Sequence, residues 1–136
     1  MRNKFDHERL RVYQLSVDCY VACVALVARV PPLQEHLVWQ LLRACSSITL
    51  NIAEGCAEFS LAEKARFYRM ALRSAAECGA AITLLVRCYA VDKAAASDIR
   101  SSLLAITGML VAMITATGRS RKKGASGAPD PHTPSP

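Results

Sequence analysis

Apolar residues recur along this chain at intervals of three and four, the spacing that places side chains on one face of an α-helix. The clearest stripe consists of Ile99, Leu103, Ile106, Leu110, Met113 and Thr117. A second stripe consists of Leu37, Leu41, Cys45, Ile48 and Ile52. Two further segments are apolar on a broad face (61–90) or on nearly every side (17–30). The pattern predicts an all-α protein with four helices.

Residues that stop or start helices mark the boundaries of these elements. Pro31 and Pro32 cannot continue a helix and therefore end the first one. Ser60, with Glu63 three residues later, is typical of a helix start, and Asp92 can cap the helix that follows it. The expected helices span residues 8–28, 35–56, 61–90 and 93–117. Because such short connections force neighbouring helices to run antiparallel, we predict an up-down four-helix bundle.

The composition changes at Gly118. Residues 1–117 form the expected bundle domain, whereas residues 118–136 are a basic, Pro/Gly/Ser-rich tail that cannot bury enough apolar surface to fold. The first ten residues are charged and lack the apolar run of a signal peptide, so we expect a cytoplasmic protein. No charge lies between Arg100 and Arg119, a gap long enough for a transmembrane helix. The large side chains of this segment lie on one stripe, however, which favours packing in a bundle over a membrane.

The chain has more apolar helix surface than a single bundle of this size can bury. Hydrophobic residues make up 52% of its 136 residues. A helix that is apolar on every side is buried on every side, and another copy of the chain is the simplest cover. We therefore expect a homo-oligomer. The contact residues that we expect are Trp39, Leu50, Ala105, Gly108 and Ala112.

Residues of the types that catalysis requires are not grouped in the sequence. Neither Glu54 nor Glu77 has a histidine three residues later, as di-metal sites in helical bundles do. There is no G-x-S-x-G motif and no glycine-rich phosphate loop. The six cysteines form no C-x-x-C pair, and we interpret them as reduced thiols that pack as small apolar core residues. We expect no enzyme activity, no cofactor and no metal site.

The formal net charge is +6, from 17 basic and 11 acidic residues, and half of the excess lies in the tail. Such a surface suits a polyanion such as RNA or DNA, although it also serves solubility. Arg66, Arg69 and Arg73 form a basic ridge about 10 Å long; its alternative interpretation is a solvated face with a local pair to Glu63. Further candidate nucleic-acid contacts are Arg87, Arg119, Arg121, Lys122 and Lys123. We expect no exposed aromatic residues for base stacking.

A polar stripe runs beside the core stripe of the second helix, in the segment SITLNIAEG (residues 47–55). At 100° per residue, the residues that fall together are Gln40, Arg43, Ser47, Asn51 and Glu54. Apolar residues flank this stripe on both sides. We expect it to be partly buried, with Arg43, Asn51 and Glu54 paired to neighbours, and to fix how the helices pair. Gly55 is expected near the helix end, where a left-handed cap suits glycine.

These residues carry a resemblance to a known family. The runs 40–44, 47–48 and 51–55 resemble the signature Q-L-R-R-A-x-x-S-I-x-x-N-I-A-E-G of the 23S rRNA intervening-sequence proteins. The similarity covers residues 8–117 and includes Ser74 and Glu77 of the third helix. It implies an antiparallel four-helix bundle assembled as a ring-like pentamer, a nucleic-acid role and no catalytic activity. Leu42 and Arg73 depart from the family's usual arginine and glycine, which moves charge from the signature to the third helix.

The expected function is that of a non-enzymatic oligomeric scaffold that binds RNA or DNA through repeated basic residues. The alternative is a protein-interaction adaptor, such as a reverse-transcriptase accessory subunit of a diversity-generating retroelement. A related branch of the family implies that role. A third possibility is a structural oligomer without a nucleic-acid ligand.

Overall fold

A computed structural model describes residues 3–88 and 90–126, and these residues form four α-helices and two short 3-10 helices without a strand. The elements are η1 (Asp6–Arg9), α1 (Arg11–Val27), η2 (Pro32–Gln34), α2 (Glu35–Ala57), α3 (Leu61–Arg87) and α4 (Lys93–Ser126). The predicted all-α, four-helix fold is confirmed. The first helix begins at Arg11 rather than residue 8, because Leu10 is extended (φ −76°, ψ 127°) and separates η1 from α1.

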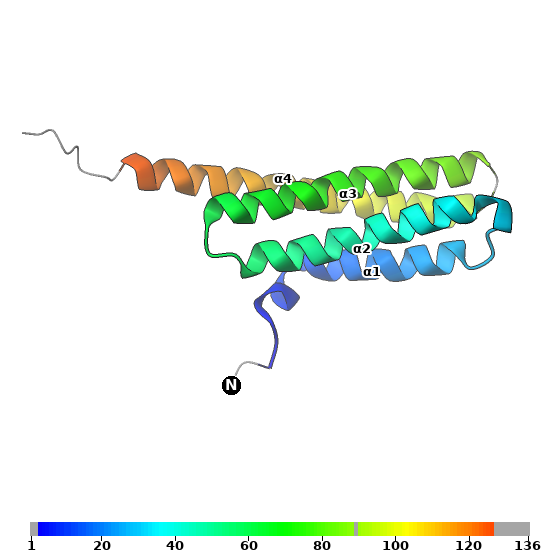
Figure 1. The fold of residues 1–136 in the computed structure, drawn as a ribbon, viewed down its shortest axis with the longest axis horizontal. Helices are drawn as coiled ribbons and strands as arrows, with labels where there is room; N and C mark the ends of the chain where they lie inside the picture. Colours follow the sequence, from blue (N-terminus) through cyan, green and yellow to red (C-terminus); the bar gives the residue numbers. More distant parts are fainter. Residues whose placement is uncertain (1–2, 89, 127–136) are drawn as a thin grey trace, which may run out of the picture.

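The four helices lie alongside one another as a bundle (Figure 1). Helices that follow one another in the chain pack together, and α4 also packs on α1. The α2–α3 connection lies at one end of the bundle, and the α1–α2 and α3–α4 connections lie at the other (Figure 1). The contact between α2 and α3 is the most extensive of the four, so the segment 47–55 lies against the largest helix–helix interface.

The predicted core stripes of α2 and α4 are buried. All five apolar residues of the α2 stripe are buried, and in α4 only Met113 of the predicted stripe is partly exposed. The largest side chains that are fully buried include Leu41, Ile48, Ile52, Leu85, Ile106 and Leu110. Burial of each such side chain contributes about 1.5–3 kcal/mol. The core therefore runs the length of the bundle and supports the outward-facing residues of α2 and α3.

Two predicted N-caps are present. The backbone N–H of Glu63 donates to the Ser60 hydroxyl over 3.4 Å, and that of Ala95 donates to an Asp92 carboxylate oxygen over 2.8 Å. Both bonds satisfy amide groups that have no partner within the first turn of a helix. These caps explain why α3 and α4 begin within one residue of their expected positions.

The end of α2 corrects one prediction. The helix continues to Ala57, with Glu58 as its extended C-cap, so Gly55 lies inside the helix and does not form the left-handed cap that we expected. A Cβ atom at Gly55 would lie 2.6 Å from Cε1 of Tyr68 and 3.1 Å from Cβ of Phe67. Glycine is therefore required at this position by the close approach of α3, not by backbone conformation.

The end of α4 corrects a second prediction. We expected this helix to end near Thr117, but it extends to Ser126, so the first nine residues of the expected tail are helical. Residues 119–123 are mostly arginine and lysine, which are good helix formers and interact favourably with the C-terminal end of the helix dipole. Residues 127–136 of the expected tail lie outside the described residues.

Helix α4 contains the segment that the sequence identified as long enough to span a membrane. Within the described residues, the segment Lys93–Gly124 is long and apolar enough to cross a membrane. One such helix is weak evidence for a membrane protein, because helices of soluble proteins can have the same length and composition. The large residues Ile99, Leu103 and Ile106 of this helix are all buried in the bundle, which agrees with the expected packing role.

Candidate nucleic-acid interface

The predicted basic ridge lies on the outward face of α3. Arg66, Arg69 and Arg73 are all exposed, and they lie on the side of the helix away from buried residues such as Ala71 and Cys78. Their intervals of three and four residues bring them into one row along the helix surface. The ridge is therefore presented to solvent as the sequence predicted.

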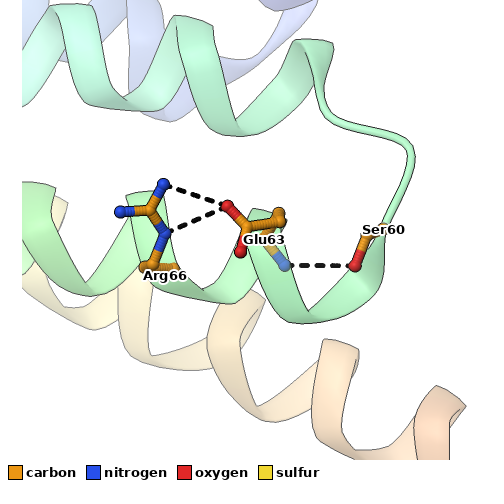
Figure 2. Close-up of polar contacts among 3 residues, drawn as sticks. All are labelled: Ser60, Glu63 and Arg66. Carbon is orange, nitrogen blue, oxygen red and sulfur yellow. Dashed lines mark hydrogen bonds and ion pairs between the residues drawn. The ribbon is translucent and has the colours of Figure 1, made fainter.

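The three arginines differ in their neighbours. Nε and Nη2 of Arg66 each lie 3.0 Å from the same Glu63 carboxylate oxygen, as Figure 2 shows. The Arg66 guanidinium also lies 4.7 Å from the ring centroid of Phe67. The side chains of Arg69 and Arg73 form no ion pair or hydrogen bond with any described residue. The local pair to Glu63 thus applies to Arg66, and Arg69 and Arg73 are the uncompensated cations of the ridge.

Arg87 does not belong to the same ridge. It lies 14 residues after Arg73, which is about 21 Å along the helix at 1.5 Å per residue. It lines a shallow pocket of about 240 Å³ between α3 and α4, together with Lys93 and Arg100. The sequence pattern alone did not single out Lys93 and Arg100. Their spacing of seven residues, two helical turns, was the available signal for a shared face.

The remaining predicted cations lie near the end of α4. Arg119, Arg121, Lys122 and Lys123 are exposed. The last turns of α4 project beyond the bundle at the end where the α2–α3 connection lies (Figure 1). Since α3 begins at that connection, the ridge and the basic end of α4 lie toward the same end of the molecule.

One expectation about aromatic residues is wrong. Phe59, in the α2–α3 connection, has a relative exposure of 101%, and Phe5 and Trp39 are also exposed. Hydrophobicity scales place phenylalanine in the core, so composition alone gave no reason to expect Phe5 and Phe59 at the surface, whereas Trp39 was expected there as a contact between copies. Phe59 lies seven residues before Arg66, at the end of the bundle where α3 begins, and surfaces that bind single strands commonly combine exposed aromatic rings with cations.

The signature residues divide into a buried group and an exposed group. In the buried group, the Asn51 amide donates to the backbone oxygen of Ser47 over 2.8 Å and to its hydroxyl over 2.9 Å. The Ser74 hydroxyl of α3 lies 3.0 Å from the same Ser47 hydroxyl. This small network joins α2 to α3 inside their interface, where an unpaired amide would be costly.

The exposed group contradicts part of our expectation for the polar stripe. Gln40, Arg43 and Glu54 of the stripe, and the signature residue Glu77 of α3, are exposed, and their side chains have no partner within residues 3–88 and 90–126. Arg43 and Glu54 are therefore not paired as we expected. Glu54 lies about 60° further around the helix than Asn51 at 100° per residue. That rotation takes it out of the α2–α3 interface. The spacing of 100° per residue identified the stripe correctly, but the α2–α3 interface is narrower than we assumed.

Lys64 has a structural role that the sequence pattern did not reveal. Its Nζ donates to the backbone oxygens of Gly55 over 3.2 Å and Cys56 over 2.9 Å. These carbonyls belong to the last turn of α2, where the usual i+4 helical N–H groups are lost, and the Gly55 oxygen also accepts from the backbone N–H of Glu58 over 3.3 Å. The lysine of one helix therefore caps the end of the preceding helix and adds a charge of the favourable sign for its dipole.

Replacing Lys64 with methionine should lower the free energy of unfolding by about 1 kcal/mol, because two charge-assisted hydrogen bonds are removed while the aliphatic stem is kept. The matched control is Lys93→Met. Lys93 is exposed at the start of α4, where a positive charge is unfavourable, so this control should be neutral or slightly stabilising. Urea unfolding followed by circular dichroism measures both. Equal destabilisation by the two changes would contradict the capping role.

The expected oligomer-contact residues are on the surface. Trp39 and Leu50 have relative exposures of 66% and 61%, and Ala105, Gly108 and Ala112 of α4 are exposed. Further large apolar side chains that are exposed are Val17, Val21 and Val24 of α1 and Leu104 and Val111 of α4. In the single chain, apolar surface on α1, α2 and α4 therefore remains exposed to solvent.

Comparison with known proteins supports the relationship indicated by the signature. The model of the family described as 23S rRNA-intervening sequence protein matches residues 8–112. A solved structure of a protein of unknown function from the S23 ribosomal protein family of Bacteroides thetaiotaomicron has a TM-score of 0.70 and 25% identity, over 76% of this chain and 95% of that one. No curated protein matches the sequence. Since the family match covers most of the chain, including residues 40–55, this chain belongs to the 23S rRNA-intervening sequence protein family.

Proposed function

We propose that this protein is a non-enzymatic, cytoplasmic, homo-oligomeric scaffold that binds RNA or DNA through basic residues repeated around the oligomer. The observation that carries the proposal is the pair Arg69 and Arg73, exposed on α3 and unpaired with any described residue. The subunit is an antiparallel up-down bundle, and the assembly is a ring, with five copies as the family resemblance implies.

Self-association is supported by the exposed apolar side chains. Trp39 and Leu50 on α2 and Val21 on α1 are each more than 60% exposed, which is unusual for large apolar residues on a stable monomer when they recur on several helices. A second copy of the same chain can bury these side chains without any other protein. A closed ring gives each subunit the same pair of contacts.

Repetition matters because one ridge alone makes a weak site. Arg69 and Arg73 are one turn apart, about 6 Å along the axis, and can contact only a couple of phosphates. The affinity of a protein for nucleic acid grows with the number of phosphates that it neutralises. In a ring-shaped oligomer, the ridge and the basic end of α4 occur once in each subunit. Phe59, at the same end of the bundle, supplies an aromatic side chain on which an unpaired base can stack.

Replacing Arg69 and Arg73 together with alanine should weaken nucleic-acid binding at low salt by about tenfold or more, equal to about 1.4 kcal/mol. The dependence of affinity on salt should also become less steep, because its slope decreases by about one for each phosphate that the protein no longer neutralises. The measurement is fluorescence anisotropy with structured RNA, single-stranded RNA and duplex DNA at low and moderate salt.

The control for that experiment removes the same charge elsewhere. Arg11 and Arg29 are exposed on or beside α1, and their double alanine variant should bind like the unaltered chain. If the Arg69/Arg73 variant and this control are indistinguishable, the ridge is not the interface. Equal weakening in both variants would indicate a response to net charge rather than to a site.

The second candidate function is a protein-interaction adaptor, such as a reverse-transcriptase accessory subunit. The exposed Trp39 and Leu50 favour it. A different protein could bury these apolar side chains just as another copy of the chain could. A reverse-transcriptase gene beside the gene for this chain would favour the adaptor. A chain that is monomeric in native mass spectrometry would remove the scaffold proposal and leave the adaptor.

A further inference from the structure

Three buried cysteines from two helices meet in the core of the bundle. Cys19 and Cys23 lie on α1 and Cys45 lies on α2, and their sulfur atoms are all within 4.8 Å of one another. Cys19 is 3% exposed, and Cys23 and Cys45 are fully buried. None of the three forms a disulfide. Within the described residues, no other group of three metal-ligating side chains comes together in this way.

The folded arrangement creates this cluster. Cys19 and Cys23 are four residues apart and therefore share one face of α1, which packs on α2. Cys45 belongs to the predicted core stripe of α2, and nothing in its local sequence places it opposite α1. We expected the cysteines to be only small core residues, because we examined each helix by itself and not the packing of α1 on α2.

We propose that Cys19, Cys23 and Cys45 form a binding site for one soft, thiophilic metal ion, Cu(I). Three sulfur atoms in a plane around a metal, with bonds of about 2.3 Å, stand about 4.0 Å from one another. The observed sulfurs lie within 4.8 Å of one another, so each pair needs to approach by less than about 1 Å. Rotation of the side chains provides movement of that size.

The donor set selects among metals. Sulfur ligands favour Cu(I) and Zn(II) over hard cations such as Mg²⁺ and Ca²⁺, which take oxygen. Structural zinc requires four protein ligands, and catalytic zinc holds a water in the fourth position. Here the fourth thiol, Cys78, contacts Cys45 but lies outside the group whose sulfurs are all within 4.8 Å of one another, and it donates to the backbone oxygen of Leu41 over 3.9 Å. A three-sulfur site that is shielded from water therefore fits Cu(I) better than Zn(II).

The three thiols of the cluster hydrogen-bond to one another. Hydrogen bonds from Cys23, and then from Cys45, lower the pKa of the Cys19 thiol, although burial opposes this change. The hydrogen bond to Cys19 raises the pKa of both Cys23 and Cys45. A hydrogen bond with Cys78 raises the pKa of Cys45 further, and burial contributes in both thiols. Binding of the ion releases thiol protons to solvent as metal–sulfur bonds form.

One member of the buried cluster borders a groove that is open to solvent. Cys19 lines an open groove of about 710 Å³ between α1 and α4. Much of the wall is alanine, and among its charged residues three aspartates (Asp18, Asp92 and Asp98) outnumber one arginine, Arg29. The negative charges raise the local concentration of cations, and the small side chains leave space beside Cys19. The groove therefore supplies the entry path that a buried metal site requires.

The test uses the full chain with Cys56→Ser and Cys88→Ser, because these are the two cysteines that are not buried. Cu(I) is titrated without oxygen in competition with bathocuproine disulfonate, and thermal unfolding is followed in parallel. We expect one Cu(I) per chain, held against the chelator, and a higher unfolding temperature, since a ligand that binds only the folded state stabilises it. Cys23→Ala and Cys45→Ala should each abolish the competing site.

Cys78→Ala is the matched control, because it removes a buried core thiol that contacts Cys45 but lies outside the group of three. It should retain the site, whereas weakening equal to that of Cys45→Ala overturns the three-sulfur assignment. Unchanged Cu(I) binding in Cys45→Ala overturns the proposal, and so does failure of the parent chain to compete with the chelator. X-ray absorption of the Cu(I)-loaded parent does not depend on any core variant. Three sulfur neighbours support the site, and nitrogen or oxygen neighbours overturn it.

Discussion

A chain that carries Trp39→Glu and Leu50→Glu should sediment as a monomer, whereas the unaltered chain should sediment as an oligomer. The two residues are 11 positions apart on α2, about three helical turns, so they lie on nearly the same side. Both are more than 60% exposed in the single chain. Burial of the exposed parts of a tryptophan and a leucine stabilises an interface by several kcal/mol. A glutamate at either place would have to be buried without a partner, which is strongly unfavourable.

Sedimentation velocity and native mass spectrometry at micromolar concentration measure this outcome, and circular dichroism establishes that the variant remains helical. The matched control is Ala76→Glu with Ala80→Glu, which adds the same two charges to exposed positions of α3. The control should keep the oligomeric state. If the Trp39/Leu50 variant also keeps it, the contact between copies lies elsewhere, and the exposed valines of α1 become the next residues to replace.

The same variant separates the two parts of the proposed function. It retains Arg69 and Arg73, so a single subunit keeps its local phosphate contacts. If binding depends on repetition of the ridge, the monomer should lose most of its affinity and most of its salt dependence. If the monomer binds as well as the oligomer, each subunit carries a complete site and the ring is not required for recognition.

Local signals made most of the fold predictable. The ends of α1 and the starts of α3 and α4 depend on Pro31, Ser60 and Asp92, whose effects act within one turn of the helix. The buried stripes of α2 and α4 follow from the period of the apolar residues. The exposure of Arg69 and Arg73 follows from the same periodicity, because it places them on the side of α3 that faces away from the buried residues of that helix.

Features that depend on pairing between helices were not predictable in this way. Lys64 caps α2 only because α3 turns back beside it, and Cys45 meets Cys19 and Cys23 only because α1 packs against α2. The exposure of Phe59 depends on the path of the α2–α3 connection. The α4 end was missed for a different reason, since a polar composition was treated as incompatible with a helix although arginine and lysine favour one.

Gly55 gives the sharpest test of the α2–α3 interface, and Gly55→Ala should lower the free energy of unfolding by about 1–3 kcal/mol. In a helix interior the same change usually stabilises a protein by about 0.5–1 kcal/mol, because alanine has the higher helix propensity. Here the new Cβ would lie 2.6 Å from the ring of Tyr68, which is itself buried. The ring cannot move away freely, and Cβ of Phe67, attached directly to the α3 backbone, is only 3.1 Å away.

Gly79→Ala is the matched control, because Gly79 also lies within a helix but a Cβ there would meet no atom within 4 Å. That variant should be more stable than the parent by about 0.5–1 kcal/mol, so the two glycine-to-alanine changes should have opposite signs. Urea unfolding at one fixed protein concentration measures both, because the stability of an oligomer depends on concentration. If Gly55→Ala is also stabilising, α2 and α3 are further apart at this point than described. The glycine that ends the N-I-A-E-G signature would then need an explanation outside helix packing.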